Sequence, residues 1–252
     1  MKKLILTGMI VSGLLAGGEV DFDTFFYLKT MRIDFYQTGN ATETIISIDQ
    51  IKEEPIWAGS TMNLIDNLEL GEHVVKVFDE ASGKLIFSKG FNSIFAEYVT
   101  TQPAIDGEFK SFHNTVLIPY PKNNVKVNFY TKSRENEPVE EYSTVIAPGS
   151  RFINHDKPKY DYEVKAYQDN GDPTKKVDIL ILPEGYTQKE MKIFRKDIDK
   201  MMKVFFDTAP FKSEKEKFNV WYIETPSKES GVDDPGAGKF YNTFYDLTYN
   251  TL

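Results

Sequence analysis

Three carboxylates follow apolar segments that have the pattern of buried strands. Glu184 comes directly after the segment Ile179–Pro183, and Asp233 and Asp234 follow the apolar segment 218–223. Carboxyl ends of neighbouring parallel strands meet at one edge of a sheet, where crevices form in open α/β folds, so we expect these side chains at the same edge. A carboxylate cluster there could bind a cation or line an active site. The alternative is turn chemistry, in which an Asp before proline initiates a turn and Glu184 accepts backbone hydrogen bonds.

The histidines lack the spacing of a metal-binding pair. Ligand pairs on one element recur at i, i+2 or i, i+4, whereas His73, His113 and His155 lie far apart, and none is followed by glutamate. The chain has no cysteine, which excludes disulfides, thiolate nucleophiles and Cys-ligated zinc. The turn at Glu184 also lacks the glycine patterns of a phosphate cradle. From these patterns alone we assign no catalytic and no metal-binding residue.

The elements around Glu184 predict a βαβ unit. Residues 179–182 are continuously apolar, as in a strand covered on both faces. Thr187 and Glu190 have the spacing of a capping box that begins a helix, and the helix should run to about Asp207. One apolar face is expected from Met191, Phe194, Ile198, Met201 and Phe205. With the strand at 218–223, the unit begins a parallel, layered α/β core.

The first part of the chain has the pattern of an all-β module. We expect strands near 31–36, 44–48, 73–78, 84–87, 115–118, 125–130, 142–146 and 163–167, with no convincing helix. About eight short strands separated by Gly- and Pro-containing turns predict a β-sandwich. The polar segment 169–176 carries Gly171 and Pro173 and is the expected linker. The predicted fold is α+β: a signal segment at 1–18, an all-β sandwich at 19–168, the linker, and an incomplete α/β (βαβ) unit at 177–252.

The net charge and the N-terminal residues limit the class of partner and the cellular location that we expect. The net charge of −8 argues against nucleic acid as a partner, because phosphates attract a positive surface. Lys2 and Lys3, an apolar run and the small residues 16–18 form the pattern of a secretory signal, the alternative being an N-terminal strand. We therefore expect export to a periplasmic, cell-surface or extracellular location. That run is too short to span a bilayer comfortably, and no later run is longer, so no integral membrane segment is expected after signal cleavage.

Several blocks of residues resemble one known family. The second half contains Leu182-Pro183-Glu184-Gly185-Tyr186-Thr187 within 178–187, followed by matching blocks at 209–213, 217–221 and 230–235. The first half contributes matching blocks at 32–36, 51–59, 63–66 and 100–104. In this order, over nearly the whole chain, these blocks resemble the N-terminal β domain and the start of the catalytic domain of IgA-peptidase-type zinc metallopeptidases.

The resemblance implies a secreted zinc endopeptidase, a hydrolase of protein or peptide substrates. In that family two histidines of a His-Glu-x-x-His helix bind zinc and the glutamate activates the bound water. This sequence has no His-Glu pair. We therefore expect a truncated form without the zinc helix that is inactive alone. Zinc is expected for the complete family enzyme and no cofactor for this chain.

A non-enzymatic alternative is a secreted binding module. The β-sandwich would then recognise a glycan or a surface protein, and exposed aromatic side chains gathered on one face would favour this role. Trp57 fits either a sugar-stacking platform or a core residue that anchors a loop. In both hypotheses a lone βαβ unit leaves sheet edges and apolar surface uncovered unless another part of a protein packs on it.

Overall fold

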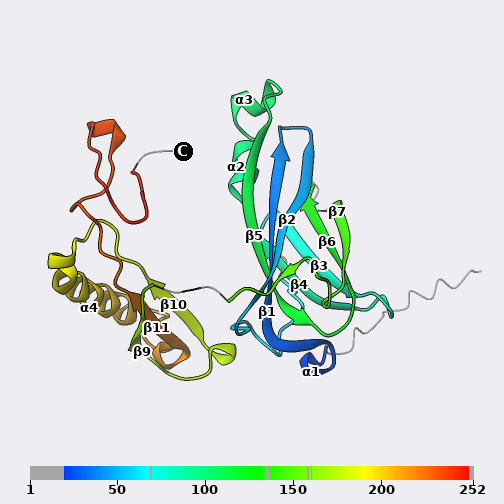
Figure 1. Cartoon of the computed structure of the whole chain (residues 1–252), viewed down its shortest axis with the longest axis horizontal. Coiled ribbons are helices and arrows are strands. Elements are labelled where there is room, and N and C mark those ends of the chain that lie inside the picture. The colour runs from blue at the N-terminus through cyan, green and yellow to red at the C-terminus, as the bar shows by residue number, and fades with distance from the viewer. Residues whose placement is uncertain (1–19, 69, 134–136, 158, 160, 250–252) are drawn as a thin grey trace, which may run out of the picture.

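The computed structural model describes residues 20–249, except 69, 134–136, 158 and 160. The expected signal segment, residues 1–18, lies outside the described residues. The strands and helices form two units along the chain, a two-sheet unit (residues 20–154) and an α/β unit (residues 164–249) (Figure 1). The predicted α+β class is confirmed.

The first sheet of the two-sheet unit has the strand order β5-β1-β2-β8. Its strands are β1 (Phe26–Gly39), β2 (Thr44–Glu54), β5 (Lys110–Pro121) and β8 (Ile153–Asn154). β1 pairs antiparallel with β2 and β5, while β8 runs parallel to β2. Asn40 forms the turn between β1 and β2, since its side-chain oxygen accepts from the N–H groups of Thr42 at 2.9 Å and Glu43 at 3.0 Å.

The second sheet has the order β4-β3-β6-β7 and is antiparallel throughout. It contains β3 (His73–Asp79), β4 (Leu85–Phe91), β6 (Val125–Lys132) and β7 (Pro138–Ile146). The strands predicted near 73–78 and 84–87 pair antiparallel as the β3–β4 hairpin. Gly83 closes its loop with a φ of 69°, a conformation that glycine adopts without steric cost.

One core joins the two sheets. Ile33 and Phe35 of β1 share it with Val77 of β3 and Phe129 of β6, and the rings of Phe35 and Phe129 lie 4.8 Å apart. Inward side chains of both sheets thus cover one another. Trp57 belongs to this core: it is buried, and its indole N–H donates to the Ser60 carbonyl at 3.2 Å. The core or anchor interpretation of Trp57 is therefore correct.

Three short helices in the two-sheet unit correct the expectation of an all-β module. They are α1 (Phe22–Phe25), α2 (Ile94–Tyr98) and α3 (Gln102–Ile105). Each has only four or five residues, which is too short for a helical repeat of apolar residues to show in the sequence. The caps Asp21 and Ser93 accept from the N–H groups of Thr24 and Ala96.

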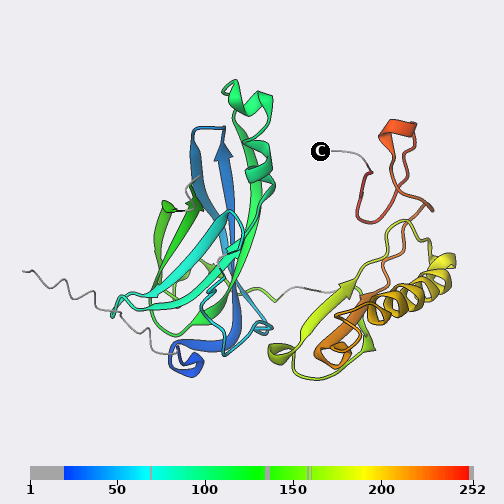
Figure 2. The same cartoon turned by 180° about the vertical axis from the view of Figure 1, so that it is seen from behind.

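The α/β unit contains a three-stranded sheet in the order β10-β11-β9. Its elements are β9 (Val164–Gln168), β10 (Val177–Ile181), α4 (Met191–Asp207) and β11 (Phe218–Ile223). Short 3-10 turns occupy η1 (Pro173–Lys175), η2 (Gln188–Glu190), η3 (Lys215–Lys217) and η4 (Pro235–Ala237). β10 and β11 are parallel and α4 connects them, so the predicted βαβ unit is present. In Figures 1 and 2 α4 lies along the sheet, and its buried residues share a core with Ile179, Ile181 and Val220.

The strand predicted at 163–167 belongs to the α/β unit and not to the two-sheet unit. β9 pairs antiparallel with β11, with Ala166 opposite Trp221. The expected linker is likewise part of this unit, because the N–H of Asn170 donates to the Asn219 side chain at 2.7 Å. The connection between the units therefore falls between β8 and β9, before the segment 169–176. Strand partners are set by contacts distant in sequence, and local turn composition did not reveal them.

The helix prediction is correct at its start and needs correction along its face. Thr187 and Glu190 form the capping box, with the Thr187 N–H donating to the Glu190 carboxylate at 2.9 Å. Met191, Phe194 and Ile198 are buried as expected, but the inner face continues through Met202 and Phe206. Met201 is 47% exposed. From Phe194 onward the buried residues are four positions apart, which keeps their side chains facing the sheet. The predicted step of three, from Ile198 to Met201, instead reaches a position that faces outward.

The face of the sheet opposite α4 is open. Leu180 is 51% exposed and Leu182 is 46% exposed. On this face Asp178 accepts from the side-chain N–H groups of Asn219 at 3.0 Å and Trp221 at 2.7 Å. Among the described residues, the α/β unit thus has one covered and one uncovered sheet face.

Candidate functional site

The turn that follows β10 is built by close approach of two glycine backbones. Gly185 has a φ of 72°, and a Cβ atom at this position would lie 2.0 Å from the Gly231 carbonyl oxygen. The Gly231 N–H donates to the Gly185 carbonyl at 3.1 Å. A side chain at residue 185 is therefore excluded both by the left-handed conformation and by space. This contact places the loop 225–249 against the carboxyl end of β10.

Glu184 holds the same loop through its carboxylate. It accepts from the Thr243 hydroxyl, from the Tyr245 N–H at 3.2 Å and from the Leu247 N–H at 3.1 Å. A carboxylate has about four lone-pair positions, so three of them already serve the loop. Glu184 is therefore an organiser of the loop, which favours turn chemistry over a free catalytic carboxylate.

Asp233 and Asp234 also stabilise turns. Asp233 accepts from the Tyr241 N–H at 2.6 Å. Asp234 caps η4 by accepting from the Ala237 N–H at 3.3 Å, and its backbone pairs with Lys239. All three predicted carboxylates thus accept from backbone N–H groups of the loop 225–249.

Sequence reasoning missed several residues that complete this loop. The Ser230 hydroxyl donates to the Glu190 carboxylate at 2.9 Å, and the Ser227 hydroxyl accepts from the Phe244 N–H at 3.1 Å. Hydrogen bonds from Thr187 and Ser230 lower the pKa of Glu190, so the capping carboxylate stays ionised. The available signal was the Ser-Gly-Val-Asp-Asp-Pro block at 230–235, whose first residue makes this contact.

The residues described by the structure do not fit a zinc centre. No group of three or more His, Cys, Asp or Glu side chains among them is arranged to hold a metal ion. His113 contacts Asp49 at 3.3 Å, His155 contacts Glu53 at 3.2 Å, and His73 lies in the two-sheet unit with hydroxyl and amide partners. The histidines expected to be unrelated therefore lie on separate elements, and we derive no metal-dependent step from them.

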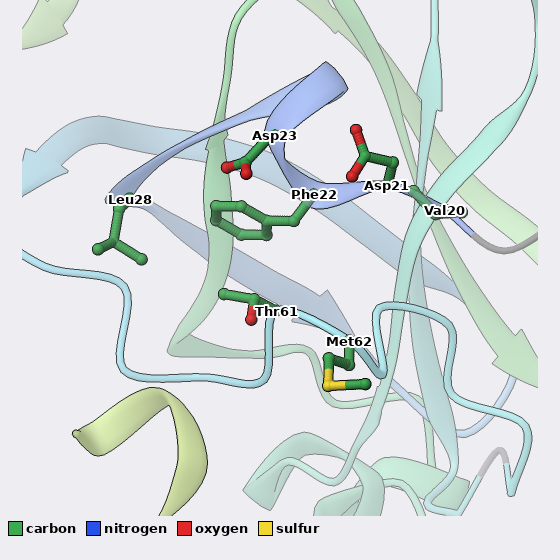
Figure 3. A pocket seen from close by; sticks show the side chains of 7 residues that line it. All are labelled: Val20, Asp21, Phe22, Asp23, Leu28, Thr61 and Met62. Carbon is green, nitrogen blue, oxygen red and sulfur yellow. The ribbon is translucent and has the colours of Figure 1, made fainter. Parts of the chain in front are cut away.

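The two-sheet unit has a shallow hollow beside α1. Its lining comes from the start of the described chain and from the loop before β3, as Figure 3 shows: Val20, Asp21, Phe22, Asp23, Leu28, Thr61 and Met62. The Asp21 carboxylate already accepts from the Thr24 N–H at 2.9 Å. The hollow is lined by polar and apolar side chains together, and one of its two carboxylates already caps α1, so it does not have the mainly apolar lining that is typical of a specific ligand site.

Among the described residues of the two-sheet unit, the exposed aromatic side chains come from several separate parts of the chain. Tyr27 and Tyr36 lie on β1, Phe109 precedes β5, and Phe152 follows β7. Tyr36 packs beside the His113 ring at 4.9 Å. Since the remaining large aromatics of this unit are mostly core, the glycan-binding alternative loses its main support.

Two family models match the chain in tandem. The model described as Peptidase M64 N-terminus matches residues 21–143, and the model described as IgA Peptidase M64 matches residues 166–252. The chain belongs to the IgA peptidase M64 family. The suspected resemblance is thus confirmed, and the second match in this peptidase family begins inside β9, in agreement with the pairing of β9 in the α/β unit. A comparison with curated proteins finds no match.

No helix among the described residues combines the length and apolar character needed to cross a membrane.

Proposed function

We propose that the chain is the N-terminal β domain and the opening of the catalytic domain of a secreted zinc endopeptidase that acts on proteins or peptides. The observation that carries the proposal is the order of the two family matches, the N-terminal domain at 21–143 and the peptidase domain at 166–252. The blocks that resemble the family lie within both of these ranges.

We further propose that these residues alone do not hydrolyse peptide bonds. A zinc peptidase of the expected type needs two histidines one helical turn apart and a glutamate beside the first. The sequence contains no His-Glu pair, and its histidines lie on separate elements. What the residues supply is a framework: two parallel strands, the helix α4 and a loop held by Glu184 and Gly185.

Export is the third part of the proposal. The order of basic residues, apolar run and small residues over positions 1–18 supports a cleaved signal. Expression with an intact N-terminus and mass spectrometry of the exported product tests it. A mature N-terminus near residue 19 is expected, and a product that retains Met1 in the cell would contradict export.

The decisive experiment measures zinc and activity on the same purified chain. Metal analysis after gel filtration at neutral pH should give far less than one zinc per chain, and a broad panel of fluorogenic peptides should remain uncut. A zinc endopeptidase of known activity serves as the positive control. About one tightly bound zinc per chain would overturn the proposal, because a zinc ion in a protein site is bound tightly enough to stay with the chain during gel filtration.

A further inference from the structure

A buried polar cluster ties both sheets of the two-sheet unit to the start of α2. We define the His73 cluster as Gln37 of β1, His73 of β3, Ser93 before α2, Asn114 of β5 and Thr131 of β6. The imidazole Nδ1 lies 3.1 Å from the Thr131 Oγ1, and its Nε2 lies 3.1 Å from the Ser93 Oγ and 3.5 Å from the Gln37 Nε2. His73 is 3% exposed and Gln37 is fully buried.

The hydrogen bonds fix which imidazole nitrogen carries the proton. The Asn114 side-chain N–H donates to the Gln37 Oε1 at 2.8 Å, which orients the Gln37 amide. Its NH₂ group therefore faces the His73 Nε2, and this nitrogen must accept. In the neutral ring Nδ1 then carries the hydrogen and donates to the Thr131 hydroxyl. The Ser93 hydroxyl is free to donate to the Nε2 while its oxygen accepts from the Ala96 N–H at 3.3 Å.

The surroundings of His73 give little support to a charged ring. On β4 its neighbour is Phe91, whose ring centroid is 5.2 Å away, and Lys89 on that strand is exposed. β7 carries Glu140, which accepts from Asn128 and Tyr130, and Glu141, which bonds Thr131. On α2 the charged residue is the exposed Glu97. Burial lowers the pKa of His73 to about 4. A proton on Nε2 would also face the Gln37 NH₂ group.

We propose that His73 is an acid-sensitive latch that holds the first turn of α2 against the two sheets. The neutral ring accepts from Ser93, the residue that caps α2, and so connects the helix start to β3. A protonated ring carries a hydrogen on Nε2, which faces the Gln37 NH₂ group, and Ser93 can bond it only by turning from donor to acceptor while it also accepts from Ala96. The closed arrangement then holds a buried charge beside a competing donor, so the segment 93–105, which carries the apolar cluster of Phe95, Tyr98 and Ala104, is held less firmly.

The direction of the pH effect follows from linkage. An exposed histidine has a pKa near 6.5, and the latched ring is held at about 4. The open state therefore takes up a proton first as the pH falls. The attachment is fully present above about pH 6.5 and is lost progressively between that value and about pH 4.

Amide exchange of the full 252-residue chain tests the latch. Exchange of residues 94–99, corrected for the intrinsic pH dependence of exchange, should show the opening equilibrium rising about 100-fold from pH 7.5 to about pH 4. The central strands β3 and β6 should change far less. His73→Gln should abolish the pH-dependent rise, because glutamine does not titrate.

His113→Gln and His155→Gln are matched controls, since both histidines are exposed, and both variants should keep the full rise. Equal exchange of 94–99 at both pH values in the unaltered chain would overturn the proposal, as would an unchanged rise in His73→Gln. If that variant fails to fold, NMR titration of the unaltered chain decides. A His73 ring that titrates near 4 supports the latch, and one that titrates above 6 overturns it.

Discussion

The two units of this M64 peptidase chain cover their apolar surfaces in different ways. In the two-sheet unit each sheet covers the other, and Ile33, Phe35 and Val77 are fully buried between them. In the α/β unit α4 covers one face of the sheet, while Leu180 and Leu182 lie half exposed on the other. A sheet covered by a single helix makes fewer contacts per residue than a sheet covered by a second sheet, so equal truncations should cost less in the α/β unit. The chain offers one tryptophan per unit as a probe, Trp57 and Trp221.

The largest effect is expected in the core of the two-sheet unit. Phe35→Ala should lower the free energy of unfolding of that unit by about 4 kcal/mol, because it removes a fully buried ring that touches Phe129. Urea unfolding followed by Trp57 fluorescence in a Trp221→Phe background measures it. Tyr36→Ala, one residue along β1 and 38% exposed, is the control and should cost far less. Similar losses in both variants would show that the outer face of β1 is also covered.

A smaller effect is expected where only one helix covers the sheet. Phe194→Ala should destabilise the α/β unit by about 3 kcal/mol, since its ring packs between Tyr186 and Tyr222. Trp221 fluorescence in a Trp57→Phe background reports this unit. The neighbouring Ile193 is 51% exposed, and Ile193→Ala should cost about 0.5 kcal/mol or less. A large loss for Ile193→Ala would mean that another surface covers α4 in solution, which would break the comparison.

The next largest loss of stability is expected from a substitution in the turn after β10. Gly185→Ala should cost about 2 kcal/mol or more, from the left-handed backbone and from the clash with the Gly231 carbonyl. Gly238 also has a positive φ, 65°, but open space around it. Gly238→Ala should therefore cost only the conformational term, about 1 kcal/mol. Thermal unfolding followed by Trp221 fluorescence compares them, and equal losses would argue against the Gly185–Gly231 contact.

The smallest effect is expected at the helix start. Thr187→Ala should lower the stability of the α/β unit by about 1 kcal/mol, because the capping box loses its threonine hydroxyl. The exposed Lys192, the second residue of α4, gives the control Lys192→Ala, which should leave stability within about 0.5 kcal/mol. The same urea titration measures both. Identical behaviour of the two variants would show that α4 gains nothing from its cap.

Local features were predictable from the sequence, and distant pairings were not. The Thr187–Glu190 capping box depends on residues within one helical turn, and the order of β10, α4 and β11 depends on the apolar pattern inside each segment. Both were predicted correctly. The partner of β9 is a strand more than 50 residues later, so the boundary between the units was placed too late. At the site, the sequence showed that Glu184 follows a strand and that Asp233 and Asp234 lie in the segment after the next strand. Their partners were not predictable, because these are backbone groups of a loop without a regular pattern.

The hydrogen bonds of Glu184 have a consequence for the order of folding. Its three donors are 59, 61 and 63 residues further along the chain. During synthesis, β10, α4 and β11 leave the ribosome before Leu247 does, and chains generally fold from the N-terminal side. The turn at Glu184 therefore stays incomplete until the last of these residues emerges. The Glu184 carboxylate thus gains its hydrogen-bond donors only after β10, α4 and β11 have all been synthesised.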